Sequence, residues 1–575
     1  MAKLVELLLP GLISQPVQML EAVFTLLLVL MLRRRPNWLR PLAGLCRAVA
    51  ARPALGLAGL ALFLGLSHFA MEWNQPRRAP RLHDEFGYLL SAETFLEGRL
   101  TNPTPPEWHA LETMHVNFTP AYNSMYPPGH PLFLAAAWRW LGHPIYANWV
   151  LAPLLGLGAW WMAAAWIPRR WALLGGALVA LRLGLFGYWA ESYMTGALPT
   201  LCALVFGGAL PRVVRRPSAG LAACSGLSLS VMFSCRPFEA FVLGACSVPM
   251  LWLLRPKSGF RPLLVPALLG LTLFMLVVGA VAYDNAVLTG NAFRFGYDLN
   301  MERHGYGVFP WSRTVGTETE VTPRLADFYE DQRGFAAFSW TPDGFFVSRI
   351  RSVGCSWVFL MGPLLSLGLL QWRRSVCVGR LRPALPGLLA AGIVIVLNPW
   401  PFPHYYSGTF GFLLVFAVTG IRLWCVRYRV SAPRAAGAML VVATAVLAVR
   451  AAGGAATAPP QALPIPWLPY STPLGFEARR TLEKEVATVA PALVFVRHGA
   501  GEPRTEDWVY NHTDPTRSPI VWANDRGPED NARTARAYAG RRPFCVEIEG
   551  GRPRSADCTP WIAAPPTDPV GLSRP

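Results

Sequence analysis

Long apolar stretches alternate with short polar connections along most of the chain. About 20 consecutive apolar residues can cross the roughly 30 Å hydrocarbon core of a bilayer as a helix. Stretches that reach or approach this length lie at about 53–71, 145–166, 171–189, 197–211, 218–234, 239–254, 262–283, 346–370, 384–400, 407–424 and 435–450. The pattern predicts an all-α polytopic membrane domain over residues 53–450, with about 11 to 12 transmembrane helices.

Charged residues divide the connections into two classes. Alternate connections are basic and contain no Asp or Glu, reading "RRRPNWLRPLAGLCRAVAAR", "PRRW", "PRVVRRP", "RPKSGFR", "RRSVCVGRLR" and "RLWCVRYRVSAPR". By the positive-inside rule these connections are cytoplasmic. Apart from Glu6 and Glu21, the acidic residues fall in the other connections or in the tail, which we expect outside. Residues 1–52 hold an apolar segment and the first basic connection. Residues 1–32 form either another crossing or an interfacial helix, and no cleaved signal peptide is expected.

Composition agrees with this topology. The 575 residues are 53% hydrophobic and 15% charged, which is far from the composition of a soluble protein. A net charge of +18 could indicate nucleic-acid binding, but the basic residues gather in the cytoplasmic connections, so we expect no nucleic-acid partner. The chain is predicted to be a multi-pass protein of a bacterial inner membrane.

The C-terminal region differs from the membrane domain. A Pro-rich linker over 451–473 precedes a region, 474–575, in which "GFEARRTLEKEVATV", "ALVFVR", "PIVWAN", "EDNARTARAYAG" and "FCVEIEG" alternate helix and strand patterns. This alternation predicts a small extracytoplasmic α/β domain, with no phosphate-binding loop or catalytic triad. Cys545 and Cys558 lie about a hairpin apart in it, and an oxidising compartment would allow them to form a disulfide.

Two external connections are long, at 72–144 and 284–345. The first contains "RLHDEFGYLLSAETFLEGRL", then "YNSMYPPGHPLFLAAAWRWLG", whose apolar part at 131–142 is too short to cross and is predicted to lie at the outer surface. Asp84 fits a helix N-cap, with Glu85 in the first turn and Gly98 after the last. A second interpretation makes Asp84 a carboxylate that deprotonates or orients an attacking nucleophile.

The order of a transmembrane helix, an external Asp-Glu pair that opens a helix, a "YPP" segment and a short surface helix resembles the first external loop of C-type glycosyltransferases. This superfamily includes the aminoarabinose transferase and the protein O-mannosyltransferases, and the resemblance covers about residues 50–290. It implies a membrane fold of that type, a polyprenyl-phosphate sugar as donor, and an essential acid at Asp84 with Glu85 beside it.

Other polar residues lie at the predicted outer ends of the crossings. Glu191 in "YWAESYMTG" occupies the place of the superfamily's second acidic site, or is a solvated turn residue. Arg236 and Glu239 in "SCRPFEAF" either bind a phosphate ester, for which a guanidinium is well suited, or simply pair with each other. Arg182 lies within an apolar run and either snorkels or faces the protein interior.

Aromatic and histidine residues complete the candidate site. His404 and Tyr405 in "NPWPFPHYYSG" either contact the donor or belong to an aromatic belt. Tyr126 and His130 in "YNSMYPPGH" lie where relatives place a phosphate-binding cation, a role for which His130 would have to be protonated. No D-x-D spacing is present, so the metal is undetermined: no cofactor is certain and a divalent metal is possible.

These observations predict a glycosyltransferase that moves a sugar from a polyprenyl-phosphate donor, held in membrane lipid, to an envelope acceptor that is a glycan, a lipid or a protein. Two alternatives remain. The first is a transporter or flippase, although no inverted repeat or pair of broken helices is visible. The second is a noncatalytic partner in envelope polysaccharide assembly.

Overall fold

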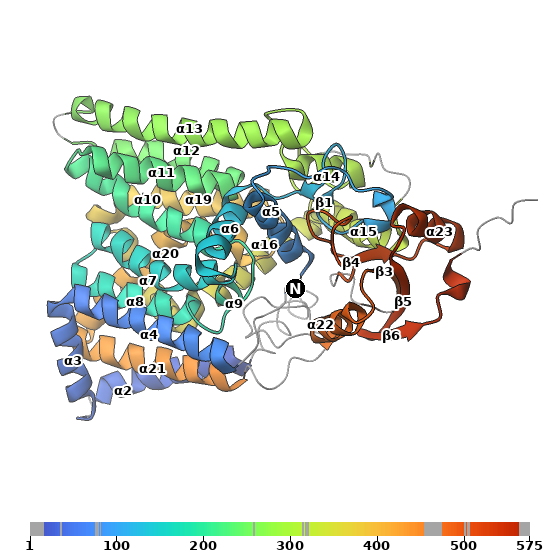
Figure 1. Ribbon diagram of the computed structural model, residues 1–575. Coiled ribbons are helices and arrows are strands. Elements are labelled where there is room, and N and C mark those ends of the chain that lie inside the picture. Colours follow the sequence, from blue (N-terminus) through green and yellow to red (C-terminus); the bar gives the residue numbers. More distant parts are fainter. Residues whose placement is uncertain are drawn as a thin grey trace, which may run out of the picture.

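The computed structural model describes residues 16–34, 37–74, 80, 82–256, 259–312, 316, 321–453, 474–499, 502 and 507–562. A helical bundle makes up one side of the molecule, and a smaller unit with a sheet lies against one of its ends (Figure 1). The smaller unit, residues 474–562, is called the tail domain below. The end of the bundle next to it is called the outer end.

The bundle is built from the apolar stretches of the sequence. Within the described residues, nine helical segments are long and apolar enough to cross a membrane, and the segments Val17–Leu32 and Ala219–Cys235 are shorter apolar helices. The chain is therefore a multi-pass membrane protein, as predicted. The helices are α2 (Pro16–Arg34), α3 (Leu39–Ala51), α4 (Pro53–Asn74), α7 (Tyr146–Trp166), α8 (Arg169–Leu183), α10 (Ala197–Arg215), α11 (Ala219–Cys235), α12 (Pro237–Leu254), α13 (Leu264–Thr289), α16 (Pro342–Ser356), α17 (Gly362–Ser366), α18 (Trp372–Val376), α19 (Leu385–Leu397), α20 (Phe410–Arg427) and α21 (Ala432–Gly453).

The structure differs from the predicted crossings in two places. The stretch at 171–189 becomes the 15-residue helix α8, which ends at Leu183 before a bend and the short helix α9 (Tyr188–Glu191). The crossing that begins with α16 is not one regular helix. Short π- and 3₁₀-helical turns, Trp357–Met361 and Leu367–Gln371, interrupt it between α16, α17 and α18. Hydropathy reports how a segment partitions into lipid, and it does not reveal such local changes of helix type.

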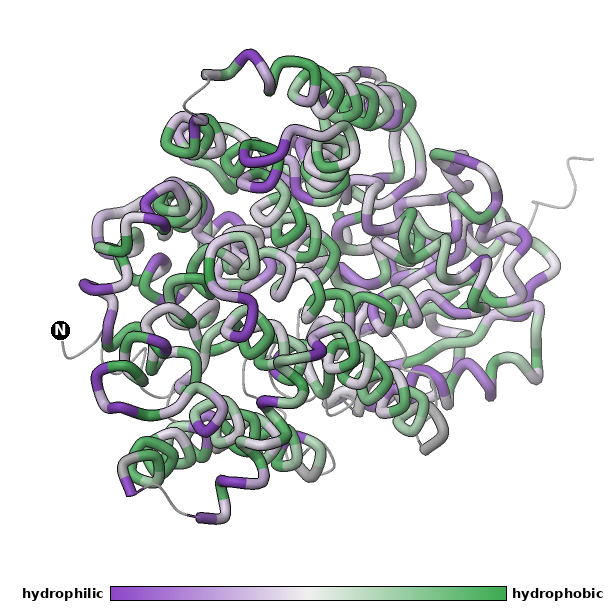
Figure 2. The backbone as a smooth tube through the Cα atoms, turned by 90° about the vertical axis from the view of Figure 1, so that its left-hand side faces the viewer, coloured by the Kyte–Doolittle hydropathy of each residue, from purple (hydrophilic) through white to green (hydrophobic). Residues whose placement is uncertain are grey.

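The basic connections gather at the end of the bundle opposite the tail domain. Figure 2 looks onto this end, where hydrophilic connections join hydrophobic helices. At the outer end, the two long connections form α5 (His83–Leu96), the 3₁₀ turn Trp108–Leu111, the hairpin β1 (Val116–Asn117) and β2 (Asn123–Ser124), α6 (Gly129–Leu141), α14 (Gly296–His304) and α15 (Pro323–Phe338). Helix α6 has 13 residues, as expected for the short surface helix.

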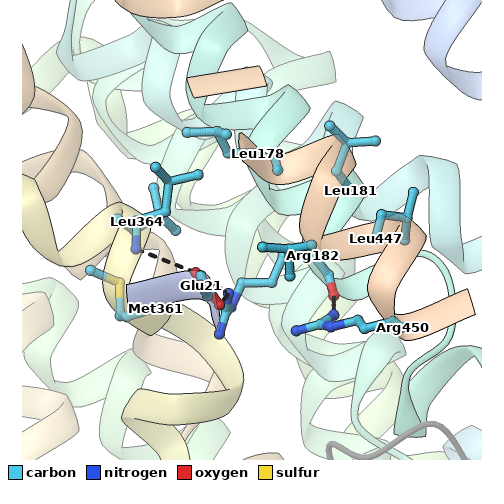
Figure 3. Close-up of a pocket in the computed structure, with 11 residues that line it drawn as sticks. Glu21, Leu178, Leu181, Arg182, Met361, Leu364, Leu447 and Arg450 are labelled. Atoms are coloured by element: carbon cyan, nitrogen blue, oxygen red, sulfur yellow. Dashed lines mark hydrogen bonds and ion pairs between the residues drawn. The ribbon is translucent and has the colours of Figure 1, made fainter. Parts of the chain in front are cut away.

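A buried ion pair attaches helix α2 to the rest of the bundle. Nη1 of Arg182 on α8 lies 2.9 Å from Oε1 of Glu21 on α2, and both side chains are almost fully buried. Arg450 donates a hydrogen bond to the carbonyl oxygen of Arg182 at 2.8 Å, as Figure 3 shows. Arg182 therefore faces the protein interior, and α2 packs beside α21 within the bundle (Figure 1). Arg182 and Glu21 carry opposite charges and pair with each other, which explains why both are tolerated between apolar helices.

The tail domain has a four-stranded sheet in the order β4-β3-β5-β6, with β3 parallel to β4 and β5, and β6 antiparallel to β5. Its elements are α22 (Leu474–Ala487), β3 (Ala492–His498), β4 (Ile520–Asn524), α23 (Pro528–Ala537), β5 (Arg542–Glu549), β6 (Arg552–Ala556) and the 3₁₀ turn Thr559–Trp561. A disulfide joins Cys545 on β5 to Cys558. Most of the predicted Pro-rich linker, 454–473, lies outside the described residues.

Alternation along β3 explains how the tail domain joins the rest of the chain. Leu493 and Phe495 point to one face of the sheet, where they pack with Leu111 and Phe118 of the first external loop. Val494 points to the opposite face and packs with residues of α22. Successive strand residues face opposite sides, so one apolar strand can be covered by a helix and by a loop at once. The loop thus supplies part of the domain's core.

Candidate active site

Helix α5 begins two residues earlier than expected. Leu82 is the N-cap, in an extended conformation, and His83 is the first helical residue. Oε1 of Glu85 accepts a hydrogen bond from the backbone N–H of Leu82 at 3.3 Å, which satisfies a donor at the helix start. The prediction that Asp84 is the N-cap is therefore wrong. Because Glu85 stabilises the helix start, the Asp84 carboxylate is available for other contacts.

The Asp84 carboxylate is the centre of a group of polar side chains. Its Oδ1 lies 2.7 Å from Nδ1 of His115 and 3.2 Å from Nε2 of His83. It also accepts a hydrogen bond from the hydroxyl of Tyr126, and that hydroxyl lies 2.9 Å from Nδ1 of His115. The Asp84 side chain keeps an exposed fraction of 21%, so part of the carboxylate can still be approached.

Electrostatics keep this carboxylate ionised. Burial raises the pKa of Asp84, but His83, His115 and the hydrogen bond from Tyr126 lower it, and the result is a pKa well below the ordinary value. Positive partners and donated hydrogen bonds both favour the charged form. Asp84 is therefore a carboxylate at every pH near neutrality.

Two glycines allow the elements of the site to approach closely. A Cβ at Gly87 on α5 would lie 2.9 Å from Oγ of Ser124 and 3.3 Å from the ring of Tyr126. A Cβ at Gly129 would lie 2.2 Å from Oγ of Ser234, at the end of α11. Contacts this short exclude a larger side chain. The first glycine brings Tyr126 to Asp84, and the second brings the start of α6 to the junction of α11 and α12.

Arg236 occupies that junction. It is both the C-cap of α11 and the N-cap of α12, and its Cζ lies 4.6 Å from the ring centroid of Tyr405, to which it also hydrogen-bonds. Its Nε is buried and has no hydrogen-bond partner among the described residues. A buried guanidinium with an unused donor is a suitable partner for a phosphate oxygen.

Tyrosines connect Asp84 with Arg236. Tyr88 stacks on Tyr126 at a ring distance of 4.3 Å. Burial raises the pKa of Tyr88, while the charge of Arg236 lowers it and that of Asp84 raises it. The same three influences act on the pKa of Tyr405. Both hydroxyls thus lie within the fields of the carboxylate and the guanidinium, which places all five side chains in one site.

The two histidines predicted as candidate ligands are neutral. Burial lowers the pKa of His130 to about 4, and its Nε2 lies 2.8 Å from the carbonyl oxygen of Tyr193. Burial and the charge of Arg236 lower the pKa of His404 well below its ordinary value, and His404 stacks against Phe402. A neutral imidazole can donate one hydrogen bond but carries no charge. Arg236 is therefore the cation beside Tyr405.

The three further acids are buried at the outer end of the bundle. Oε2 of Glu85 accepts a hydrogen bond from the backbone N–H of Tyr193 at 2.9 Å, which ties α5 to the turn after α9. Glu191 lies two residues before Tyr193 and is buried rather than solvated. Glu239 lies in the first turn of α12, where its charge acts on Arg236. Of the predicted site residues, the structure thus brings together Asp84, Tyr126, Arg236 and Tyr405. Glu85 has a structural role instead, because it binds backbone N–H groups at the start of α5 and after α9.

Three side chains around Asp84 could together bind a metal ion. The ligand atoms of His83, Asp84 and His115 all lie within 4.8 Å of one another. Two imidazole nitrogens and a carboxylate oxygen are a ligand set found around Zn²⁺ in enzymes. In the structure the same atoms satisfy one another by hydrogen bonding.

The sequence analysis missed His83, His115 and Tyr88. His83 directly precedes Asp84 in the helix. Tyr88 follows Asp84 by four residues, a spacing that places Asp84 and Tyr88 on the same face of the helix. His115 lies 31 residues from Asp84, and its backbone has a φ of 60°, which is uncommon outside glycine. Such strain gathers at functional sites, but it is not visible in a sequence.

No protein-family model and no curated protein sequence matches the chain. Solved structures similar to it include ArnT from Cupriavidus metallidurans bound to undecaprenyl phosphate, with 14% identity, 86% of this chain and 93% of that chain covered, and a TM-score of 0.45. The oligosaccharyltransferase of Archaeoglobus fulgidus, tethered with an acceptor peptide, shares 11% identity over 85% of this chain, with a TM-score of 0.44. This chain covers 63% of the oligosaccharyltransferase.

Proposed function

We propose that the protein is a glycosyltransferase of the bacterial inner membrane that moves a sugar from a polyprenyl-phosphate donor to an envelope acceptor on the extracytoplasmic face. The observation that carries this proposal is the pairing of an ionised carboxylate, Asp84, with a buried guanidinium, Arg236, across a group of tyrosines at the outer end of the bundle. The site combines the two charges that glycosyl transfer from a phosphate ester requires.

Arg236 is proposed to bind the phosphate of the donor. Its unused Nε donor and its position between two membrane helices would place the phosphate at the membrane surface while the isoprenoid chain stays in lipid. Tyr405 is fixed against Arg236 and can donate a further hydrogen bond. Charge-assisted hydrogen bonds to a phosphate are among the strongest that a side chain can form.

Asp84 is proposed to orient the hydroxyl of the acceptor. The hydroxyl oxygen forms a bond to the anomeric carbon, the bond from that carbon to the phosphate oxygen breaks, and polyprenyl phosphate leaves with the electron pair. A carboxylate with a low pKa is a weak base, so its main contribution is to align the hydroxyl and to stabilise the positive charge that develops on the sugar. The hydroxyl proton leaves to solvent or to the departing phosphate. A single displacement inverts the anomeric centre.

The tail domain is proposed to hold the loop that carries His115. Nδ2 of Asn524 donates hydrogen bonds to the carbonyl oxygens of Ala110 and Glu112, at 3.3 Å and 2.9 Å. On the other side of His115, the hydroxyl of Tyr122 donates to the carbonyl oxygen of Asn511 at 3.2 Å. The loop is therefore anchored to the tail domain both before and after the residue that contacts Asp84.

The decisive experiment is sugar transfer by the purified protein in nanodiscs, with radiolabelled polyprenyl-phosphate sugars and membrane extract as the source of acceptor. Release of polyprenyl phosphate coupled to labelling of an acceptor is expected. Translocation of the intact donor across liposomes without transfer would identify a flippase instead. Neither transfer nor translocation, over a panel of donor sugars, would favour a noncatalytic partner. The two cysteines of the tail domain form a disulfide, so a cysteine is introduced at an exposed position, as in Arg517→Cys, and its labelling in whole cells should report an extracytoplasmic location.

A further inference from the structure

A second candidate binding site lies at the end of the bundle opposite the tail domain. A groove of about 710 Å³ runs between the first turns of α4 and the last turns of α7. Its walls are apolar and include Ala58 and Ala61 of α4 and Leu157 and Trp160 of α7. Helix α4 is buried on one side only, and Leu55, Leu62 and Leu66 are exposed on it. Ala54 and Ala58, which line the groove, are themselves exposed, so in a membrane the groove is open to lipid.

The groove ends at two arginines. Arg169, at the start of α8, is exposed, and its side chain makes no hydrogen bond or ion pair with the described residues. Arg212, on α10, donates to the carbonyl oxygens of Gly208 and Trp161, and its Cζ lies 3.8 Å from the ring centroid of Trp161. These contacts hold the guanidinium at the mouth of the groove, where its charge is not neutralised.

These arginines lack an acidic partner among the residues that the structure describes. Arg215, in the last turn of α10, donates only to the carbonyl oxygen of Ala165. Within the part of the chain that the structure describes, no carboxylate lies within ion-pair distance of Arg169, Arg212 or Arg215. The connections at this end also contain no Asp or Glu. Clustered arginines beside an apolar groove are complementary to an anion that carries a hydrocarbon chain.

We propose that this groove binds an anionic glycerophospholipid of the cytoplasmic leaflet. An acyl chain would lie along the apolar walls between α4 and α7, and the headgroup phosphate would meet Arg169 and Arg212. A soluble anion would not use the apolar walls, and a zwitterionic lipid would bring a cationic group to a site that already holds only cations. Basic pockets between transmembrane helices on the cytoplasmic side are suited to such headgroups.

Native mass spectrometry of the delipidated full-length protein tests this proposal without any transfer assay. The probes are dioleoylphosphatidylglycerol and dioleoylphosphatidylcholine, each titrated separately. We expect the wild type to bind the first more tightly, and Arg169→Gln to weaken that binding about fivefold without affecting the second. Ala58→Phe, which fills the groove, should also weaken phosphatidylglycerol binding.

Arg216→Gln is the matched control, because Arg216 is exposed at the same end but does not line the groove. Its phosphatidylglycerol binding should equal that of the wild type. Equal affinity of the wild type for the two lipids would overturn the proposal. So would an Arg169→Gln variant that is indistinguishable from Arg216→Gln, or an Ala58→Phe variant that binds as well as the wild type.

Discussion

Nδ1 of His115 lies 2.7 Å from Oδ1 of Asp84, although 31 residues of sequence separate the two and His115 directly precedes the hairpin of β1 and β2. This contact joins the start of α5 to a residue whose backbone is held in the left-handed region. Together with His83 and Tyr126, this contact orients the carboxylate and lowers its pKa. The predictions below begin with it.

Asp84→Asn should abolish transfer while leaving the fold intact. Leu82 and Glu85 provide the helix start, so the substitution removes no cap, and the amide oxygen can still accept hydrogen bonds. The amide carries no negative charge, and the expected loss of activity is about 100-fold or more. Glu330→Gln, an exposed carboxyl change on α15, is the control. Full transfer by a well-folded Asp84→Asn protein would show that transfer does not need the negative charge of Asp84.

His115→Asn should move the acid limb of the pH profile to higher pH. Asparagine tolerates the left-handed backbone at this position, so the loop should keep its shape. His115 helps to hold the pKa of Asp84 below its usual range, and the pKa therefore rises when the imidazole is lost. Activity then falls at a higher pH on acidification. The measurement is kcat/KM against pH, and an unchanged acid limb would separate His115 from the ionisation of Asp84.

Arg236→Lys should weaken binding of the lipid-linked donor. Lysine retains the charge but loses the planar fork and the Nε donor. One lost charge-assisted hydrogen bond corresponds to a fall of roughly tenfold or more in kcat/KM. The KM for the donor should rise while the KM for the acceptor stays constant. Arg255→Lys, at the other end of α12, serves as the control. A change confined to the acceptor KM would contradict the assignment.

Docking of the tail domain should weaken as the pH rises above neutrality. The hydrogen bond from Nδ1 of His512 to Glu93 on α5, at 2.9 Å, raises the pKa of His512. A raised pKa stabilises the folded state fully below the unfolded pKa of roughly 6.5, and this contribution disappears as the pH passes the folded value. The side chain of His512 is 60% exposed, so solvent screening keeps the effect small.

Hydrogen exchange of α5 and of residues 507–524 at pH 6 and pH 8 measures this effect. Protection should be higher at pH 6 in the wild type, and the difference should shrink in His512→Gln. Arg517→Gln, which alters an exposed pair with Asp514 in the same loop, should behave like the wild type. Equal protection at both pH values in the wild type would contradict the prediction.

The Cys545–Cys558 disulfide should stabilise the tail domain by about 3 kcal/mol, the chain-entropy value for a loop of this size. Mass spectrometry of alkylated, non-reduced protein should find this bond and eight free cysteines. Replacing both cysteines with serine should lower the protection of β5 and β6 against exchange, whereas Cys377→Ser, at an exposed cysteine, should not. Ten alkylated cysteines in protein purified without reductant would reject the disulfide.

Local sequence properties determined the membrane architecture. Hydropathy and the one-sided distribution of arginines are read segment by segment, and they located the bundle, the end at which the basic connections gather, the two long connections at the other end and the tail sheet. They also placed Asp84 and Arg236 at ends of helices on the same face, because a polar residue beside an apolar run must lie at the membrane surface. The helix types within 342–376 and the short α8 were not visible at this level.

Tertiary structure alone decided which side chains meet. His115, whose φ is positive, reaches Asp84 across 31 residues of sequence, and Glu21 pairs with Arg182 across 161. The tail sheet completes its core with residues of the first external loop. These contacts form between segments that are far apart in the sequence. The free energy that favours them comes from packing and desolvation in the folded chain, and the periodicity of a single segment does not contain this information.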